Sequence, residues 1–247
     1  MATLLTGLTR ALAVLEELAA AGPKGLPIRE IAAKTALDKA VVHRILATLK
    51  AKGYAEQNPE SGDYFLGTSS LALADVYLKQ DNLRGILHEA AVEVSAQSNE
   101  LCHVGVPEGK GVRYIEKIEP DHSIRVVSHI GIVNPQATTS LGRAILAAQC
   151  GNRSELDAYL GQESNDRVWD AVSQAHTQGF ALEIEENEPG ISCVGVAVVR
   201  DGQPVAAMSL TVPADRMPQE RQMELGNLLR STLAKKLPPN LSIPAIY

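Results

Sequence analysis

Apolar residues near the start of the chain recur at helical spacing and predict short helices in succession. The first spans residues 6–21, and we expect its apolar side to close a three-helix core: Leu8, Ala11, Leu12, Leu15, Leu18 and Ala19. The second begins near Ile28, and a tight turn at residues 35–37 separates it from the third. Asp38 begins the third helix, where we expect its carboxylate to accept a hydrogen bond from an unpaired N–H group. Two helices joined by such a turn are typical of a helix-turn-helix motif.

The third predicted helix, which continues to about Lys52, has two chemically different faces. One face is an apolar stripe: Val41, Val42, Ile45, Leu46 and Leu49. The other combines small residues with cations and a histidine: Lys39, Ala40, His43, Arg44, Ala47 and Lys50. Small side chains permit close approach to a DNA major groove, and cations attract phosphate. We therefore expect Lys39 and Lys50 mainly at phosphates, and Arg44 and His43 near base edges. An ordinary amphipathic helix with a solvated basic face is the alternative.

A hairpin and a further helix follow the helix-turn-helix. Gly53 ends the third helix, and β-type runs at residues 54–58 and 64–66 flank the turn sequence P-E-S-G-D. This arrangement predicts a winged helix-turn-helix domain over residues 1–67. Residues 68–80 then form a linker helix, whose apolar stripe is Leu71, Ala74 and Leu78. We expect that stripe to form a dimer contact, or else to pack on its own domain.

The rest of the chain, residues 81–247, alternates helical and strand-like segments. Helices are expected at residues 82–97, 138–149, 154–160, 166–178 and 218–236. Strands are expected at residues 101–106, 112–118, 124–130, 180–184, 194–200 and 205–211. A turn is expected at residues 131–135. The pattern predicts an α+β domain with a mostly antiparallel sheet.

Composition restricts the class of protein. The chain has 247 residues, 45% of them hydrophobic, with a mean hydropathy of -0.04. No apolar run approaches the roughly 20 residues that a membrane helix needs, and no signal-peptide pattern is seen. The cysteines Cys102, Cys150 and Cys193 are odd in number and far apart, which argues against a disulfide framework or a zinc cluster. We therefore expect a cytoplasmic protein.

Charge is unevenly distributed along the chain. The formal net charge is -6, yet residues 1–78 contain eight basic and eight acidic residues. A neutral module with a local basic patch is compatible with DNA binding, because the field at the groove is local. Few phosphate contacts are available per subunit, so we expect dimerisation to contribute to DNA affinity.

Enzymatic signatures are missing from the sequence. It contains no G-x-S-x-G, glycine-rich phosphate loop, H-E-x-x-H or paired C-x-x-C motif. The scattered histidines are expected to be surface or supporting groups, so we predict no metal, no cofactor and no catalytic residues. An enzyme with Cys193 as nucleophile is the remaining alternative, but no base has a position that a motif supports.

Several motifs together resemble the isocitrate-lyase-regulator (IclR) family of bacterial transcription factors. In the first domain they are R-A-L-A-V-L-E-E-L at residues 10–18, I-R-E-I-A at 28–32, V-H-R-I-L-A-T-L-K-A-K-G-Y at 42–54 and Y-F-L-G at 64–67. In the second they are S-L-G-R-A-I-L-A at 140–147, G-F-A-L-E-I-E-E-N-E-P-G-I-S-C-V-G-V-A-V at 179–198 and V-A-A-M-S-L-T-V-P at 205–213. The resemblance implies a winged helix joined to a GAF/profilin-like effector-binding domain. It also implies a homodimer or tetramer that binds a palindromic operator in double-stranded DNA. The implied effector is a small organic or aromatic acid, expected to be a carboxylate.

The resemblance also assigns an effector pocket. Its positions in this chain are Ser140, Leu141, Glu183, Ile191, Cys193, Ser209 and Thr211. The backbone N–H groups of Ser140 and Leu141 begin a helix, which is a favourable place for an anion. Ser209 and Thr211 alternate on one strand and so point to one face. Alternatively, Cys193 is a small core residue, and the two hydroxyl residues pack under the final helix.

Some positions depart from the family pattern. The family often has Pro-Lys-Ser-Thr before V-H-R, whereas this chain has Asp38-Lys39-Ala40-Val41. The arm before Leu8 has no cation, and the wing turn carries Glu60 and Asp63. These departures motivate a second hypothesis, a metabolite-binding oligomeric module with weak or lost DNA binding.

Overall fold

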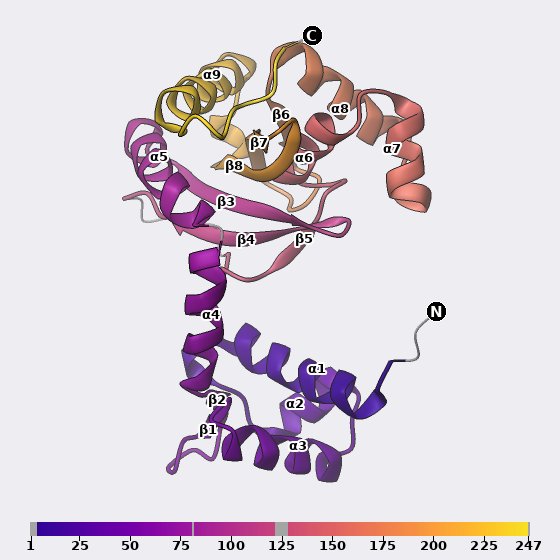
Figure 1. Cartoon of the computed structure of the whole chain (residues 1–247), viewed down its shortest axis with the longest axis vertical. Coiled ribbons are helices and arrows are strands. Elements are labelled where there is room, and N and C mark those ends of the chain that lie inside the picture. Colours follow the sequence, from indigo (N-terminus) through magenta and orange to yellow (C-terminus); the bar gives the residue numbers. More distant parts are fainter. Residues whose placement is uncertain (1–3, 81, 122–127, 247) are drawn as a thin grey trace. The chain divides into compact units, whose positions relative to one another are not determined.

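The computed structural model describes residues 4–80, 82–121 and 128–246 (Figure 1). The chain divides into two compact units, Met1–Asp81 and Asn82–Tyr247. Both contain helices and strands, and the sheet of the second unit is antiparallel throughout, which confirms the expected α+β class. Within the described ranges, no helix has both the length and the apolar character that crossing a bilayer requires.

The first unit is a winged helix-turn-helix. Helices α1 (Thr6–Ala21), α2 (Ile28–Thr35) and α3 (Lys39–Ala51) precede the paired strands β1 (Ala55–Gln57) and β2 (Tyr64–Leu66). Ala36 adopts a left-handed conformation with φ of 53°, which makes the sharp turn between α2 and α3. The core is formed by side chains from all three helices and the wing: Val14, Leu18, Ile31, Ala32, Val42, Leu46, Ala55 and Tyr64.

Two expectations about the first unit were wrong. Asp38 is the N-cap residue of α3, but its side chain makes no capping hydrogen bond. Leu8 and Leu12 of α1 are 58% and 49% exposed, while Val14 and Leu18 fill the core. The two leucines are exposed because the apolar side of α1 is wider than the part that α2 and α3 cover, so some of it faces solvent.

Helix α4 (Ser69–Gln80) follows the wing. Ser69 fixes its start, because its N–H donates to the carbonyl of Gly53 and its hydroxyl donates to the carbonyl of Lys52. Leu71 is 70% exposed and Ala74 is also exposed, so the predicted stripe does not pack on its own domain at these positions. The side chain of Leu78 lies outside the described part of the helix.

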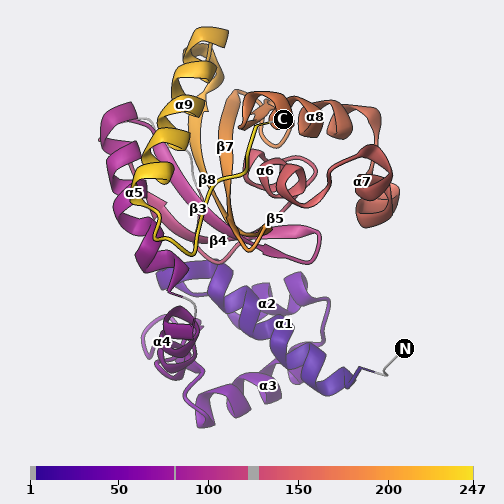
Figure 2. The same cartoon turned by 45° about the horizontal axis from the view of Figure 1, so that its top comes forward.

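The second unit contains a six-stranded sheet of order β5-β4-β3-β8-β7-β6. The strands are β3 (Leu101–Glu108), β4 (Gly111–Ile118), β5 (Val133–Pro135), β6 (Ala181–Ile184), β7 (Ile191–Arg200) and β8 (Gln203–Pro213). The helices are α5 (Leu83–Ser98), α6 (Ser140–Gln149), α7 (Arg153–Leu160), α8 (Asp166–Gln178) and α9 (Gln219–Lys236). Figure 2 shows α5 and α9 side by side on one face of the sheet, with α6 and α8 on the other.

The region before α6 differs from the expectation. The predicted strand at residues 124–130 lies partly outside the described residues, and residues 128–130 are not in a strand. Of the predicted turn at residues 131–135, Gly131 is in a turn, but Val133–Pro135 form the short strand β5, which pairs with Gly111–Arg113 of β4. A turn sequence gave no sign of this strand, because the pairing depends on a segment about 20 residues away.

Small residues let α6 approach the sheet closely. Ala144 of α6 packs with Ala197 of β7 and Ala207 of β8 in one buried cluster. A Cβ atom on Gly195 would lie 2.7 Å from the carbonyl oxygen of Ser140, so no larger residue fits there. The first turn of α6 is therefore held directly against β7, beside Cys193.

Candidate functional site

The outer face of α3 is the candidate DNA-binding surface. Lys39, Ala40, His43 and Arg44 are all exposed, whereas Val42 on the opposite face is completely buried. Among the residues that the structure describes, none forms an ion pair with Lys39, His43 or Arg44. These side chains are therefore exposed on the face that the helical spacing predicted, and their contacts with phosphates and base edges stay a prediction.

Lys50 is placed differently from the other predicted DNA contacts. Its ammonium donates to Gln57 Oε1 of the wing at 2.9 Å and lies 5.7 Å from the centre of the Tyr64 ring. The Gln57 amide in turn donates to the carbonyl of Gly62 at 3.0 Å, within the wing turn. Lys50 thus joins α3 to the wing, an arrangement that no local pattern in the sequence signals.

The candidate effector pocket of the second unit is a cavity of about 190 Å³. It is lined by His103, Tyr114, Ser128, Ile132, Asn134, Glu183, Asn187, Glu188, Ile191, Cys193 and Thr211. Four of the seven positions predicted from the sequence are in this lining: Glu183, Ile191, Cys193 and Thr211. They come from strands β6, β7 and β8, so the sheet brings together residues that are far apart in the chain.

The other three predicted pocket positions lie beside the cavity rather than in its lining. Ser140, which starts α6, lies beside Cys193. Leu141 is buried in the core between α6 and the sheet. Ser209 is also buried and pairs along the backbone with His103 on one side and Gly195 on the other. All three support the pocket wall.

A buried polar network forms one side of the pocket. The His103 ring lies with Nδ1 3.2 Å from Thr211 Oγ1 and Nε2 2.7 Å from Ser128 Oγ. The Cys193 thiol lies 3.4 Å from the same Thr211 hydroxyl. The sequence indicates His103, like the other scattered histidines, only as a surface or supporting group, and it gives no sign of Ser128. His103 and Thr211 share a face of the sheet because β3 pairs with β8, and no local sequence pattern signals that pairing.

Burial keeps the titratable groups of this network uncharged. It lowers the pKa of His103 to about 3, with a smaller contribution from the Lys117 charge. It raises the pKa of the Cys193 thiol, and the nearby Glu183 carboxylate raises it further. It raises the pKa of Tyr114 to about 12. A thiol that stays protonated lacks the thiolate that an activated nucleophile needs.

Glu183 brings a carboxylate into the pocket. One of its oxygens, Oε1, accepts hydrogen bonds from the backbone N–H groups of Glu186 and Asn187, at 2.6 and 3.0 Å. The side chain is only 2% exposed. Glu183 therefore both lines the cavity and shapes the loop that follows β6.

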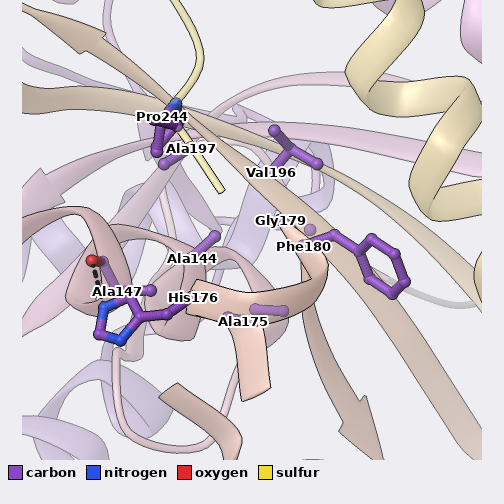
Figure 3. A pocket seen from close by; sticks show the side chains of 12 residues that line it. Ala144, Ala147, Ala175, His176, Gly179, Phe180, Val196, Ala197 and Pro244 are labelled. Carbon is purple, nitrogen blue, oxygen red and sulfur yellow. Dashed lines mark hydrogen bonds between the residues drawn. The ribbon is translucent and has the colours of Figure 1, made fainter. Parts of the chain in front are cut away.

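Two further cavities lie between α6, α8 and residues 242–245. The smaller one holds about 20 Å³, room for one or two water molecules, and alanines make up half of its lining (Figure 3). His176 Nε2 lies 2.8 Å from the carbonyl oxygen of Ala147 in this cavity. The larger one is about 770 Å³. Neither contains a predicted effector residue in its lining, so the pocket around Cys193 remains the candidate effector site.

Two family models match the sequence. The sequence matches the family model for the IclR helix-turn-helix domain over residues 7–59. It matches the model for the C-terminal domain of bacterial transcriptional regulator IclR over residues 75–237. The second match alone covers more than half of the chain.

Curated and solved relatives extend over most of the chain. The HTH-type transcriptional regulator XynR of Escherichia coli is 31% identical over 204 residues, covering 78% of this chain and 80% of that protein. The glycerol operon regulatory protein of Streptomyces coelicolor is 32% identical over 232 residues, covering 90% and 91%. The crystal structure of Thermotoga maritima IclR is 27% identical with a TM-score of 0.70, covering 91% and 94%. The chain therefore belongs to the IclR family of ligand-responsive, DNA-binding bacterial transcriptional regulators.

Proposed function

We propose that this regulator binds a palindromic operator as a homodimer or tetramer, with α3 in the major groove. Residues 1–67 bind DNA, residues 68–80 form the helix that links the two domains, and residues 81–247 bind a small organic acid in the cytoplasm. The observation that carries the proposal is the exposed row Lys39, Ala40, His43 and Arg44 on α3, opposite a completely buried core stripe.

The exposed residues of α3 are suited to two kinds of contact, one with phosphates and one with base edges. Lys39, at the first residue of α3, is suited to phosphate, because helix N-termini and cations both favour anions. Ala40 leaves room for the groove wall. Arg44 has a planar fork that matches guanine in the major groove, and His43 lies next to it. Lys50 acts through the wing, where its ammonium is already engaged by Gln57.

Exposed leucines favour pairing of the first unit. Helix α1 and the residues before it expose Leu4, Leu5, Leu8 and Leu12, and α4 exposes Leu71, Leu73 and Val76. Apolar surface gathered on two helices of one small unit is typical of a protein interface. A two-fold pair would present two α3 helices to two half-sites, which is why a palindromic operator is proposed.

The pocket chemistry favours a small polar effector. A cavity of about 190 Å³ admits a molecule of few heavy atoms. The start of α6 lies against β7 at Cys193 and supplies the positive end of a helix, which favours a carboxylate. An IclR homologue from Microbacterium hydrocarbonoxydans, 18% identical with a TM-score of 0.71, was crystallised with 4-hydroxybenzoate. We therefore propose a small organic or aromatic acid as the effector.

The second candidate is a metabolite-binding oligomer with weak or lost DNA binding. The exposed carboxylate of Glu60 in the wing turn and the neutral charge of residues 1–78 favour it. Both features would weaken contact with phosphate.

A gel-shift titration of the full chain against DNA from upstream of its own gene separates the two candidates. The first predicts a sequence-specific shift that weakens as salt rises, and a shift that needs more protein in Arg44→Ala. A shift that is missing, or that is equal on unrelated DNA, would favour the second candidate.

A further inference from the structure

Arg143 is a charged residue buried inside the second unit. It lies in the first turn of α6, with its side chain only 2% exposed. Its guanidinium donates to the carbonyl of Ala137 at 2.9 Å and to that of Leu182 at 3.0 Å. It also forms a paired contact with the Glu186 carboxylate, at 2.8 and 2.5 Å. A buried charge is tolerated only when it is paired in this way.

The partner of Arg143 belongs to the wall of the effector pocket. Glu186 lies in the loop of residues 185–190 that joins β6 to β7, and the next two residues, Asn187 and Glu188, line the cavity. Apart from Glu186, which is 12% exposed in its side chain, the residues of this loop are exposed. An exposed loop has few apolar contacts of its own, so its position depends on specific polar contacts.

Glu183 provides a second hold on the same loop. Its Oε1 accepts hydrogen bonds from the backbone N–H groups of Glu186 and Asn187, while Arg143 pairs with the Glu186 carboxylate. Glu186 is thus held through both its backbone and its carboxylate. A second arginine, Arg167, also reaches Glu186 Oε2 at 3.1 Å, but its side chain is 71% exposed.

We propose that Arg143 is a positioning residue that fixes the loop of residues 185–190 as a wall of the effector pocket and so sets the shape of the ligand that fits. The part about the ligand rests on the proposed function. The part about the loop does not, and it is testable without knowing the effector. Arg167 serves as a natural comparison, because it pairs with the same carboxylate from the solvent side.

Cys193 provides the readout, because it lines the cavity behind this loop while Cys102 and Cys150 are buried elsewhere. The experiment measures alkylation of each thiol of the full chain by iodoacetamide, using mass spectrometry. The variants are Arg143→Lys, which keeps the charge and loses the paired geometry, and Glu186→Gln, which keeps the shape and loses the charge. The control is Arg167→Gln.

We expect both test variants to alkylate Cys193 at least about tenfold faster than the natural chain, with Cys102, Cys150 and the Arg167→Gln control unchanged. An unchanged Cys193 rate in both would overturn the proposal. So would equal acceleration of all three thiols, which would mean that the pair supports the whole unit, or equal acceleration in Arg167→Gln. None of these results depends on DNA or effector binding, so the proposed function is judged separately.

Discussion

At the scale of single residues, the regulator separates exposed charges from buried ones. Arg44 and Lys39 are exposed to solvent on α3, where we propose that they contact phosphates or base edges. Arg143 and Glu183 are buried around the pocket, where each of their contacts is made inside the protein. Changes in the first pair should alter DNA affinity alone, and changes in the second pair should alter the pocket.

Arg44→Ala tests the proposed base contact. We expect operator affinity to fall by about 5- to 150-fold, which corresponds to 1–3 kcal/mol for a bidentate base contact. Thermal stability should stay the same, because the side chain is exposed. Fluorescence anisotropy on a labelled operator measures the affinity. Lys235→Ala, which removes an exposed cation from α9, is the matched control and should bind like the natural chain. Equal binding by both variants would remove Arg44 from the interface.

His103 makes stability depend on pH. Its pKa is lowered from 6.5 to about 3, so between these values the unfolded chain binds a proton that the folded chain does not. Its contribution to stability is therefore complete above pH 6.5 and is lost as pH falls toward 3. His103→Gln should show a smaller drop in melting temperature between about pH 7 and about pH 5 than the natural chain. Parallel melting curves for the two proteins would contradict a buried neutral histidine.

Sequence spacing could predict which side of α3 faces outward, because helical periodicity is a local property. It could not show that Lys50 bonds to Gln57, or that the His103 ring bridges Thr211 and Ser128, because these contacts join distant segments. The resemblance to a family supplied Cys193 and Thr211 as pocket positions. Tyr114 and Asn134 came only from the structure, since they enter the cavity from strands whose pairing the sequence does not specify.

At the scale of elements, the wing depends on its attachment to α3. Strands β1 and β2 have three residues each, too short to be stable without support. Lys50 and Gln57 supply one attachment, and the burial of Tyr64 supplies another. The longer elements were predicted closely: α8 covers residues 166–178 as expected. β5 was missed because its pairing with β4, rather than its own sequence, makes it a strand.

Salt dependence distinguishes two roles for Lys50. If it positions the wing, Lys50→Ala and Gln57→Ala should weaken operator binding by similar factors, and the double variant should be no weaker than either. The slope of log affinity against log salt should then stay unchanged in Lys50→Ala. In Lys39→Ala the magnitude of the slope should fall by about 1, which corresponds to the loss of one phosphate contact. A reduced slope in Lys50→Ala would show that this lysine meets phosphate directly.

At the scale of the whole molecule, function requires two compact units in one chain and, as we propose, more than one copy of that chain. The formal charge of -6 comes entirely from residues 79–247, so the DNA-binding unit has no overall positive charge to draw it to DNA. Pairing doubles the number of phosphate and base contacts per complex, and affinity rises accordingly. We propose that the exposed apolar surface of α1 and α4 forms the contact between copies.

A double substitution on α1 tests this pairing. Leu8→Glu with Leu12→Glu places two carboxylates in the exposed apolar face, where burial in an interface would be costly. We expect a smaller assembly by sedimentation velocity and an operator affinity reduced by at least about tenfold. Val92→Glu, at an exposed apolar site on α5, is the control and should keep the natural assembly. An unchanged assembly in the α1 variant would move the interface elsewhere.

One measurement tests most directly whether an effector bound in the second unit changes DNA binding by the first. A thermal-shift screen of small organic acids first identifies a ligand, which at about 100 times its dissociation constant adds roughly 2.7 kcal/mol of stability. The operator dissociation constant of the full chain is then measured with and without that acid, in the natural protein and in Glu183→Gln. We expect the dissociation constant to change by at least about fivefold in the natural protein, the lower end of typical coupling between sites, and by less in the variant. An operator affinity that is the same with and without an acid bound at the Cys193 pocket would contradict this expectation.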